Sequence, residues 1–269
     1  CPYQYIYIKI REYNIFLDSE GDFKFVYSRL LNSITMNKYL TLLLLIITVP
    51  AQAQYISSQP INASKIKLWQ PRLISDYEGT YHFGDSEDET TLLILYTGEK
   101  VVAQVISGDW NDDGTAWVNH YRNLSEVKID KDGNFRSKEY TGQFVIYNDA
   151  EAKPCLKIDN PWSSMLAEGE YELGPKTSSV DEAFAGKFPQ ASTTILDEEE
   201  LKSWPSEDLQ IMRNEIFARY GYTFRPNGKM DQYFRKQSWY KAHHKDVNSF
   251  LTSIEQKNIQ LIRKEEKSR

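Results

Sequence analysis

The sequence predicts an α+β protein of two domains: an antiparallel all-β meander, arranged as a barrel or sandwich, followed by a small all-α domain. Three observations predict this fold. Short runs rich in Val, Ile, Tyr and Phe recur about every 8 to 12 residues over 76–174. Gly, Pro and Ser interrupt the pattern over 175–190. Helix-capping signals and helical periodicity follow over 191–269.

The first element along the chain is an export signal. Within MNKYLTLLLLIITVPAQAQ, Lys38 precedes an apolar run from Tyr39 to Val49, and Ala51-Gln52-Ala53 follows. This order is typical of a secretory signal peptide, and the run is shorter than the roughly 20 residues that span a bilayer. We therefore expect an exported protein, periplasmic or at the cell surface, cleaved between Ala53 and Gln54 and without a stable transmembrane anchor.

The position of this export signal within the chain also predicts how the rest of the chain is organised. A signal peptide normally begins a protein, so the residues before Met36 are expected to be an upstream extension. The predicted organisation is an extension over 1–35, a signal peptide over 36–53, a lead-in over 54–75, the β-meander domain over 76–174, a linker over 175–190 and the helical domain over 191–269.

Composition indicates a folded soluble protein, and the distribution of charge distinguishes the β-meander part from the helical part. The chain is 41% apolar and 26% charged, as in a folded soluble protein. Residues 54–205 carry 14 Lys and Arg against 26 Asp and Glu, a net of −12, whereas residues 206–269 carry 13 against 8, a net of +5. The basic end suggests an anionic partner such as a wall polymer, a lipid headgroup or the acidic module itself. Nucleic acid is not expected for an exported protein.

The β-meander domain is predicted from eight short runs. They are residues 77–83, 90–97, 100–107, 115–121, 124–130, 142–148, 155–159 and 168–173. Gly98-Glu99 fits a two-residue hairpin loop, and Asp132-Gly133 fits a turn between Ile129 and Phe135. Short connections of this kind favour a meander over a crossover topology.

One acidic turn resembles half of a calcium loop. DWNDDG places Asp109, Asn111 and Asp113 at the opening positions of such a loop, but its twelfth position is His120 instead of the required Glu. The pattern is more typical of an Asp/Asn/Gly-rich turn. No cofactor is expected, and calcium at these three residues is the alternative left open.

Aromatic residues leave a second alternative open. Gly79 to Tyr81 resembles the start of lipocalin-type barrels, which would imply a small-ligand binder. Trp110, Trp117, Tyr121 and Phe144 are candidates to line such a cavity. In a module of this size, aromatic side chains more often fill the core.

Sequence signals typical of helices begin after the linker. Asp197 with Glu200 and Thr252 with Glu255 have the three-residue spacing of capping pairs, and Ser206 after Pro205 is expected to cap another helix. Along that helix Leu209, Met212, Ile216 and Tyr220 form one apolar face. In the last helix the predicted buried stripe is Leu251, Ile254, Asn258, Leu261 and Ile262.

The stretch RNEIFARYGYTF, residues 213–224, combines charged and aromatic side chains on the central helix. Glu215 precedes Arg219 by four residues, which predicts an ion pair, and Gly221 fits the left-handed position at a helix end. Asn214 or Arg213 is expected to bond carbonyls of the linker folded over the helix. Because buried charges persist when they are paired, we interpret the cluster as polar architecture.

The segments LDEEEL, LQIMRNEIFARYGYTF, YFRKQSWY and LTSIEQKNIQLI together resemble the YARHG domain, an extracellular module of bacterial proteins, over about the last 75 residues. The family occurs on secreted or surface-exposed chains, sometimes beside kinase or peptidase domains, and no enzymatic activity is established for it. The usual His of the motif is Tyr220 here and its leading Tyr is Phe217, so an acid–base role of that histidine cannot apply. The resemblance makes these residues binding candidates: Arg213, Asn214, Glu215, Arg219, Tyr220, Trp239 and Tyr240.

The favoured function is a non-enzymatic protein of the bacterial cell envelope that binds or anchors to a wall component or a partner protein. The rival is an envelope-acting hydrolase or lyase that uses Asp109, Asp112 or Glu139 of the acidic module. The sequence contains no HExxH, GxSxG or Gly-rich phosphate loop, so no catalytic residue is assigned. The adjacent pair His243-His244 would need further ligands to hold a metal. The oligomeric state is left undecided.

Overall fold

The computed structural model describes residues 8–10, 13–17, 23–26 and 61–269, except 85, 161 and 163–170. The chain divides into two compact units, Cys1–Tyr55 and Ile56–Arg269. The first holds a three-stranded antiparallel sheet of β1 (Ile8–Ile10), β2 (Tyr13–Leu17) and β3 (Phe23–Val26). The expected signal peptide and its cleavage point lie outside the described residues. Among the helices that are described, none has the length and apolar character to cross a membrane.

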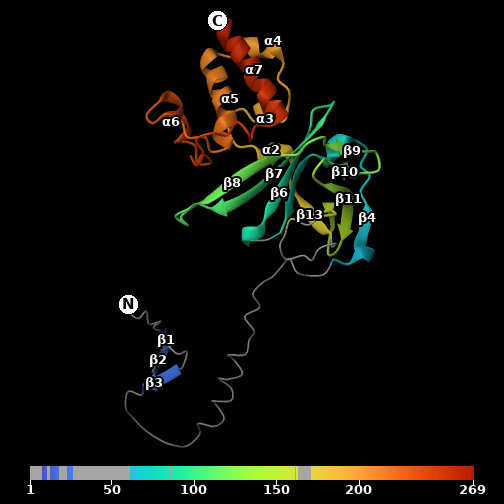
Figure 1. Ribbon diagram of the computed structural model, residues 1–269, viewed down its shortest axis with the longest axis vertical. Helices are drawn as coiled ribbons and strands as arrows, with labels where there is room; N and C mark the ends of the chain where they lie inside the picture. The colour runs from blue at the N-terminus through green and yellow to red at the C-terminus, as the bar shows by residue number, and fades with distance from the viewer. Residues whose placement is uncertain are drawn as a thin grey trace, which may run out of the picture. The chain divides into compact units, whose positions relative to one another are not determined.

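The second unit begins with a ten-stranded antiparallel sheet (Figure 1). Its strands are β4 (Ile66–Leu68), β5 (Gly79–Phe83), β6 (Thr90–Tyr96), β7 (Val101–Trp110), β8 (Trp117–Asn123), β9 (Lys128–Ile129), β10 (Asn134–Arg136), β11 (Thr141–Asn148), β12 (Ala152–Ile158) and β13 (Glu172–Ser178). The order is β8-β7-β6-β5-β13-β12-β11-β10-β9, with β4 paired to β11. Two meanders, β5 to β8 and β9 to β13, are thus joined where β5 pairs with β13.

The two predicted hairpin turns are confirmed. Thr97 N donates to Lys100 O at 2.9 Å around Gly98-Glu99, and Gly133 N donates to Asp130 O at 3.0 Å between β9 and β10. The run 124–130 contributes only the short strand β9, because Glu126 has a left-handed φ of 54° that breaks the extended backbone. The predicted antiparallel β domain is therefore confirmed, with a shorter strand at this point.

The stretch predicted as a linker over 175–190 begins inside a strand. β13 runs from Glu172 to Ser178 through Gly174-Pro175. Pro175 is tolerated because β13 pairs with β5 only at Lys176 and Ser178, beyond the proline. The Gly-Pro pair, a frequent turn signal, here lies in the strand that joins the two meanders.

The sheet has two faces with different neighbours. Side chains of the inner face, which include Tyr81, Leu92 and Val105, meet Phe135, Phe144 and Leu156 from the second meander and fill one core. Alternate residues form the outer face, where Leu93 and Leu95 pack on Ile254 of the helical part. This alternation follows from the two-residue period of a β-strand.

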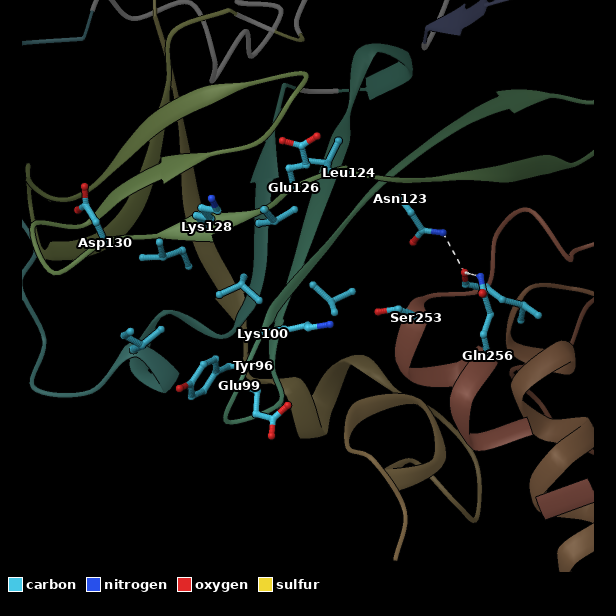
Figure 2. Close-up of a pocket in the computed structure, with 16 residues that line it drawn as sticks. Tyr96, Glu99, Lys100, Asn123, Leu124, Glu126, Lys128, Asp130, Ser253 and Gln256 are labelled. Atoms are coloured by element: carbon cyan, nitrogen blue, oxygen red, sulfur yellow. Dashed lines mark hydrogen bonds between the residues drawn. The ribbon is translucent and has the colours of Figure 1, made fainter. Parts of the chain in front are cut away.

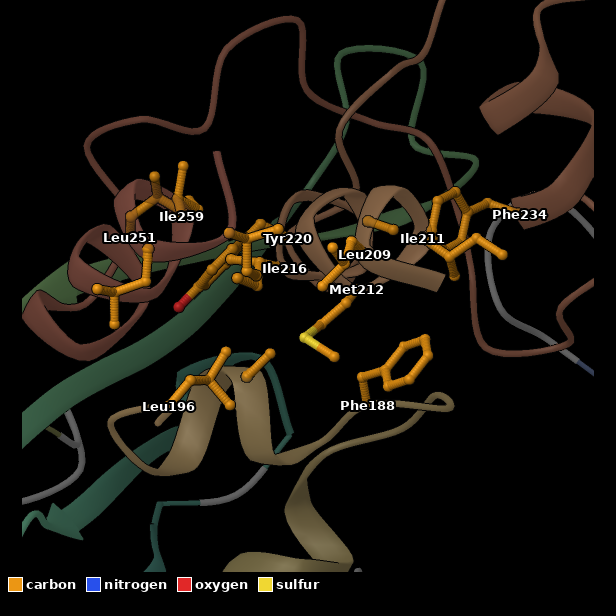
Figure 3. Packing of buried hydrophobic residues seen from close by; sticks show 14 of the residues in the cluster. Phe188, Leu196, Leu209, Ile211, Met212, Ile216, Tyr220, Phe234, Leu251 and Ile259 are labelled. Atoms are coloured by element: carbon orange, nitrogen blue, oxygen red, sulfur yellow. The ribbon is translucent and has the colours of Figure 1, made fainter. Parts of the chain in front are cut away.

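Six helices follow β13 in the described part of the chain. They are α2 (Val180–Ala183), α3 (Gln190–Thr193), α4 (Glu198–Ser203), α5 (Ser206–Arg219), α6 (Lys229–Phe234) and α7 (Ser253–Lys267). Buried apolar side chains from α5 and α7 and the loops around them form the helical core (Figure 3). The predicted apolar face of α5 and the predicted stripe of α7 are both buried.

Of the three predicted helix caps, the Thr252–Glu255 pair is confirmed in full, and the Asp197–Glu200 pair only in its Asp197 half. The Asp197 side chain accepts the N–H groups of Glu199 and Glu200, and Thr252 with Glu255 forms a reciprocal capping box. The third prediction is wrong: Ser206 is the first residue of α5, and Pro205 stands at its N-cap without a side-chain bond. The ring of Pro205 fixes its φ, so the chain enters the helix in a set direction without a polar cap.

The helical part packs directly on the outer sheet face. Tyr121 of β8 makes an edge contact with Tyr220, with ring centroids 4.7 Å apart, and lies 5.3 Å from the ring of Phe250. The sheet and the helices therefore belong to one compact unit, Ile56–Arg269.

Candidate functional site

The motif residues 213–224 cover the second half of α5 and the turn after it, and Glu215 is the buried acid at their centre. Its side chain is 1% exposed. Oε2 accepts the N–H of Lys187 at 2.8 Å, and Oε1 accepts the N–H of Phe188 at 2.7 Å. A Cβ on Gly186, whose φ is +120°, would collide with this carboxylate. The connector before α3 is thus folded tightly around Glu215.

Arg219 lies one turn after Glu215 on the same side of α5. Its Nη2 donates to Glu215 Oε1, its Nε donates to Ala185 O at 2.8 Å, and its Nη1 donates to Ser192 Oγ at 2.8 Å. Burial lowers the pKa of Arg219 from its ordinary value, and Glu215 opposes that shift. The guanidinium therefore ties three separate segments together.

A second buried carboxylate, Glu255, enters from α7. Its Oε1 accepts the Ser192 hydroxyl at 2.6 Å, while its Oε2 accepts the Tyr220 hydroxyl at 2.6 Å and the Thr252 N–H at 2.9 Å. Complete burial raises the pKa of Glu255, and these hydrogen bonds work in the opposite direction. Glu255 thus caps α7 and also accepts the hydroxyl of Tyr220.

The polar chain continues from the helices into the sheet. Tyr220 Oη lies 3.4 Å from Gln104 Oε1, and Gln104 Nε2 donates to Phe250 O at 2.6 Å. Asn123, next to Gln104 across β7 and β8, donates to Leu251 O at 3.0 Å. Burial and the Glu255 carboxylate together raise the pKa of Tyr220 well above its ordinary value. We call this connected set Glu215, Arg219, Ser192, Glu255, Tyr220 and Gln104 the motif network.

The motif network uses its polar atoms internally. The predicted Glu215–Arg219 pair is confirmed, and both carboxylates accept several donors of the protein itself. A buried charge with complete hydrogen bonding stabilises a packed arrangement, whereas its truncation leaves partners without bonds. The arrangement accounts for the polarity of this stretch without a ligand.

Two other motif residues act differently from the prediction. Arg213 pairs with Glu266 of α7, with Nε 2.8 Å from Oε2, and Asn214 Nδ2 donates to Gln210 O at 2.7 Å. Neither bonds a linker carbonyl, because Arg213 faces α7 and Asn214 bonds its own helix, and Arg219 makes that bond instead. Tyr240 is buried and donates to Tyr222 O at 2.6 Å, while Trp239 is half-buried beside it.

The turn with the calcium-like pattern is closed by its own backbone. Asn111 Oδ1 accepts the N–H groups of Thr115 at 2.8 Å and Ala116 at 3.1 Å. Asp109 and Asp113 are exposed at the end of the β7–β8 ribbon. Within the described residues no group of three or more His, Cys, Asp and Glu side chains is placed to hold a metal ion.

Of the three carboxylates of the hydrolase alternative, Glu139 lies far from Asp109 and Asp112. Asp109 pairs in register with Val118 near the start of β8, and Asp112 lies in the turn just before that strand. Glu139 accepts the N–H of Ser125 at 3.0 Å, beyond the other end of β8. Seven residues of extended chain span about 20 Å. Paired glycosidase carboxylates are within about 10 Å of each other, so Glu139 forms no such pair with Asp109.

The proposed lipocalin-like cavity residues also separate. Phe144 is fully buried in the inner core with Phe135 and Leu156. Trp110 and Trp117 instead lie at the end of the β7–β8 ribbon, outside that core, because the ribbon extends past the second meander (Figure 1). The inner face is therefore occupied by side chains at the positions where a ligand was considered.

A groove of about 750 Å³ lies where the sheet meets α7 (Figure 2). Its apolar lining is aliphatic apart from Tyr96: Ile74, Val101, Val102, Leu124, Val127, Ile129 and Leu251. Its charged lining carries both signs: Glu99, Lys100, Glu126, Lys128 and Asp130. Ser253 and Gln256 at the start of α7 form one side of the groove, and Lys128 and Asp130 lie on the other. Both modules thus contribute to one open site.

The sequence shows neither the groove nor half of the motif network. Glu255 was visible only as a capping residue, because the sequence does not show that its carboxylate also reaches Ser192 and Tyr220. Gln104 gave no signal at all. The groove residues come mainly from β6 to β9, the loops between these strands and the start of α7, so they lie far apart in the sequence and form no motif.

Comparisons with known proteins concern the helical part. Neither a curated protein nor a solved structure matches the chain. A family model, that of the YARHG domain, matches residues 187–267. The match starts at Lys187, where the backbone first bonds Glu215. Residues 187–267 are therefore identified with the YARHG domain, an extracellular bacterial domain, and the sheet lies outside that match.

Proposed function

We propose that this protein is exported to the bacterial cell envelope, with cleavage between Ala53 and Gln54, and binds a partner protein through the groove without catalysing a reaction. The extracellular occurrence of the YARHG domain supports the compartment. The single observation that carries the binding role is the groove itself, an open site of about 750 Å³ built jointly by the sheet and α7. Ligand sites occur preferentially at such junctions.

The lining indicates the kind of partner. An aliphatic floor with charges of both signs at the rim is the anatomy of a protein–protein interface. A wall polymer of one charge would meet repulsion from either Lys100 and Lys128 or Glu99 and Glu126. A polypeptide segment with its own mixed charges matches this rim.

Site-specific crosslinking tests the proposal. A photoreactive amino acid in place of Gln256, inside the groove, is expected to capture a distinct envelope protein in whole cells. The same substitution at Lys236, exposed near the end of α6, is the matched control. Val127→Arg should then abolish the Gln256 crosslink by filling the groove. Identical products from both positions, or a crosslink that survives Val127→Arg, would refute the groove as the binding site. Release of wall fragments by the purified protein would instead support the hydrolase.

A further inference from the structure

The outer face of the sheet is covered over only part of its length. On β7 the side chains of Gln104, Ile106 and Trp110 belong to this face, and their exposure rises in that order. Gln104 is 2% exposed and lies under the helical part, Ile106 is half-buried, and Trp110 at the ribbon end is 52% exposed. The uncovered half therefore begins near Ile106 and ends at Trp110.

Two tryptophans at this end form a fixed aromatic platform. Trp110 and Trp117 are direct cross-strand partners, with ring centroids 5.7 Å apart and planes at 86°. A Cβ on Gly108 would collide with the Trp117 indole, so that ring lies against the backbone. Trp110 Nε1 donates to Glu87 Oε1 at 2.9 Å. Both rings are thus held in place, while Trp110 remains accessible.

Neutral polar groups continue the platform toward the helices. Asn119, the register partner of Gly108, is exposed on the same face. It also lines a recess of about 310 Å³ between the sheet and the helical part, together with Thr80, Ser178 and Trp239. Arg219 and Glu255 of the motif network lie in the same lining, where their charged groups are bonded within the protein. His82 and Thr91 belong to this face on the neighbouring strands and lie 3.3 Å apart through Nδ1 and Oγ1. Tryptophan, amide, hydroxyl and imidazole groups therefore follow one another along the uncovered half.

We propose that this uncovered half, from Trp110 and Trp117 through Asn119 to the recess at Trp239, binds a glycan chain without net negative charge. The negative face of an indole ring attracts the C–H groups on the apolar side of a pyranose. Amide and hydroxyl side chains both donate to and accept from sugar hydroxyls. Glu87 and Glu89 beside the platform repel a polyanion. The site is separate from the groove, whose floor is aliphatic and whose rim carries both charges.

Calorimetry with a soluble neutral probe tests this site. The hexamer of N-acetylglucosamine should bind the purified mature chain and change its tryptophan fluorescence. Trp110→Ala should weaken binding at least about tenfold, because it removes the accessible stacking ring. Leu73→Ala removes another exposed apolar side chain, away from the platform, and should leave the affinity unchanged. Dextran sulfate should bind more weakly than the neutral hexamer.

Three outcomes would overturn the glycan proposal. They are no binding of the hexamer to the wild-type chain, equal affinity of Trp110→Ala with an unchanged melting curve, and stronger binding of dextran sulfate. Loss of a captured envelope protein in Trp110→Ala, without any glycan binding, would assign this face to a protein instead. Val127→Arg separates the two sites, since it should abolish partner crosslinking while glycan binding persists.

Discussion

The motif network and the groove both contain charged side chains, but these side chains have different roles in the two places. In the network, the buried acids Glu215 and Glu255 accept bonds from backbone, serine, tyrosine and arginine donors of the protein itself. In the groove, Lys128 and Glu126 are exposed to solvent. Residues 213–224, the most distinctive stretch of the sequence, thus form their polar contacts within the protein. The open groove is lined by residues that form no recognisable motif.

Desolvation explains this difference. A charge that leaves water must regain its hydrogen bonds inside the protein, so a buried cluster such as Glu215 and Arg219 is fixed by internal partners. An exposed lysine keeps its water and can exchange that water for a ligand. Recognition by charge is therefore expected at the groove, and stability is expected to depend on the network.

Truncation of Glu215 gives the largest expected loss of stability. Glu215→Ala leaves Arg219 buried without its carboxylate and orphans the N–H groups of Lys187 and Phe188. Breaking a buried pair costs about 3–5 kcal/mol, which for a chain of this size lowers the melting temperature by roughly 10 °C. Thermal unfolding followed by circular dichroism measures the shift.

Glu207→Ala is the matched control on the same helix. Its pair with Lys229 is exposed on both sides, so the melting temperature should stay within about 2 °C. An equal melting temperature for Glu215→Ala and the wild type would show that the motif network does not stabilise the fold. The proposed difference between the network and the groove would then be wrong.

The sequence predicts this contrast only in part. The spacing of Glu215 and Arg219 and the capping box at Thr252 are local patterns, and both are confirmed. The meander follows from strand spacing and from the hairpin loop at Gly98. Local patterns could not show that the hydroxyl of Tyr220 meets Glu255 from α7, 35 residues away along the chain. Long-range register decides such contacts, and it also creates the groove.

The pH dependence of stability tests Glu255 specifically. Burial raises the pKa of Glu255 above its unfolded value, so the folded state binds the proton more tightly. Its contribution is then complete below the unfolded pKa and is lost as pH rises through the folded pKa. Glu255→Gln keeps an acceptor for Tyr220 and cannot ionise. The wild-type melting temperature minus that of the variant should therefore fall between pH 4 and pH 8.

A control keeps this difference specific. Glu199→Gln removes an exposed carboxylate that pairs with Lys202 on α4, and its curve should run parallel to the wild type over the same interval. A wild-type-minus-variant difference for Glu255→Gln that rises with pH would mean that the hydrogen bonds to the Glu255 carboxylate outweigh its desolvation. The sign of the argument would then reverse.

Charge reversal in the groove gives the smallest expected effect on stability and the sharpest test of the contrast. Lys128 is exposed at the rim, so Lys128→Glu should change the free energy of unfolding by no more than about 0.5 kcal/mol. The same substitution places a third acid beside Glu126 and Asp130, which should slow association with an acidic segment of a partner and speed it with a basic one. Crosslinking yield from Gln256 at low and high salt measures this change. If Lys128→Glu lowered the melting temperature as far as Glu215→Ala does, the rim charge would be structural. A loss of that size is expected only when the replaced side chain has hydrogen-bond partners inside the protein.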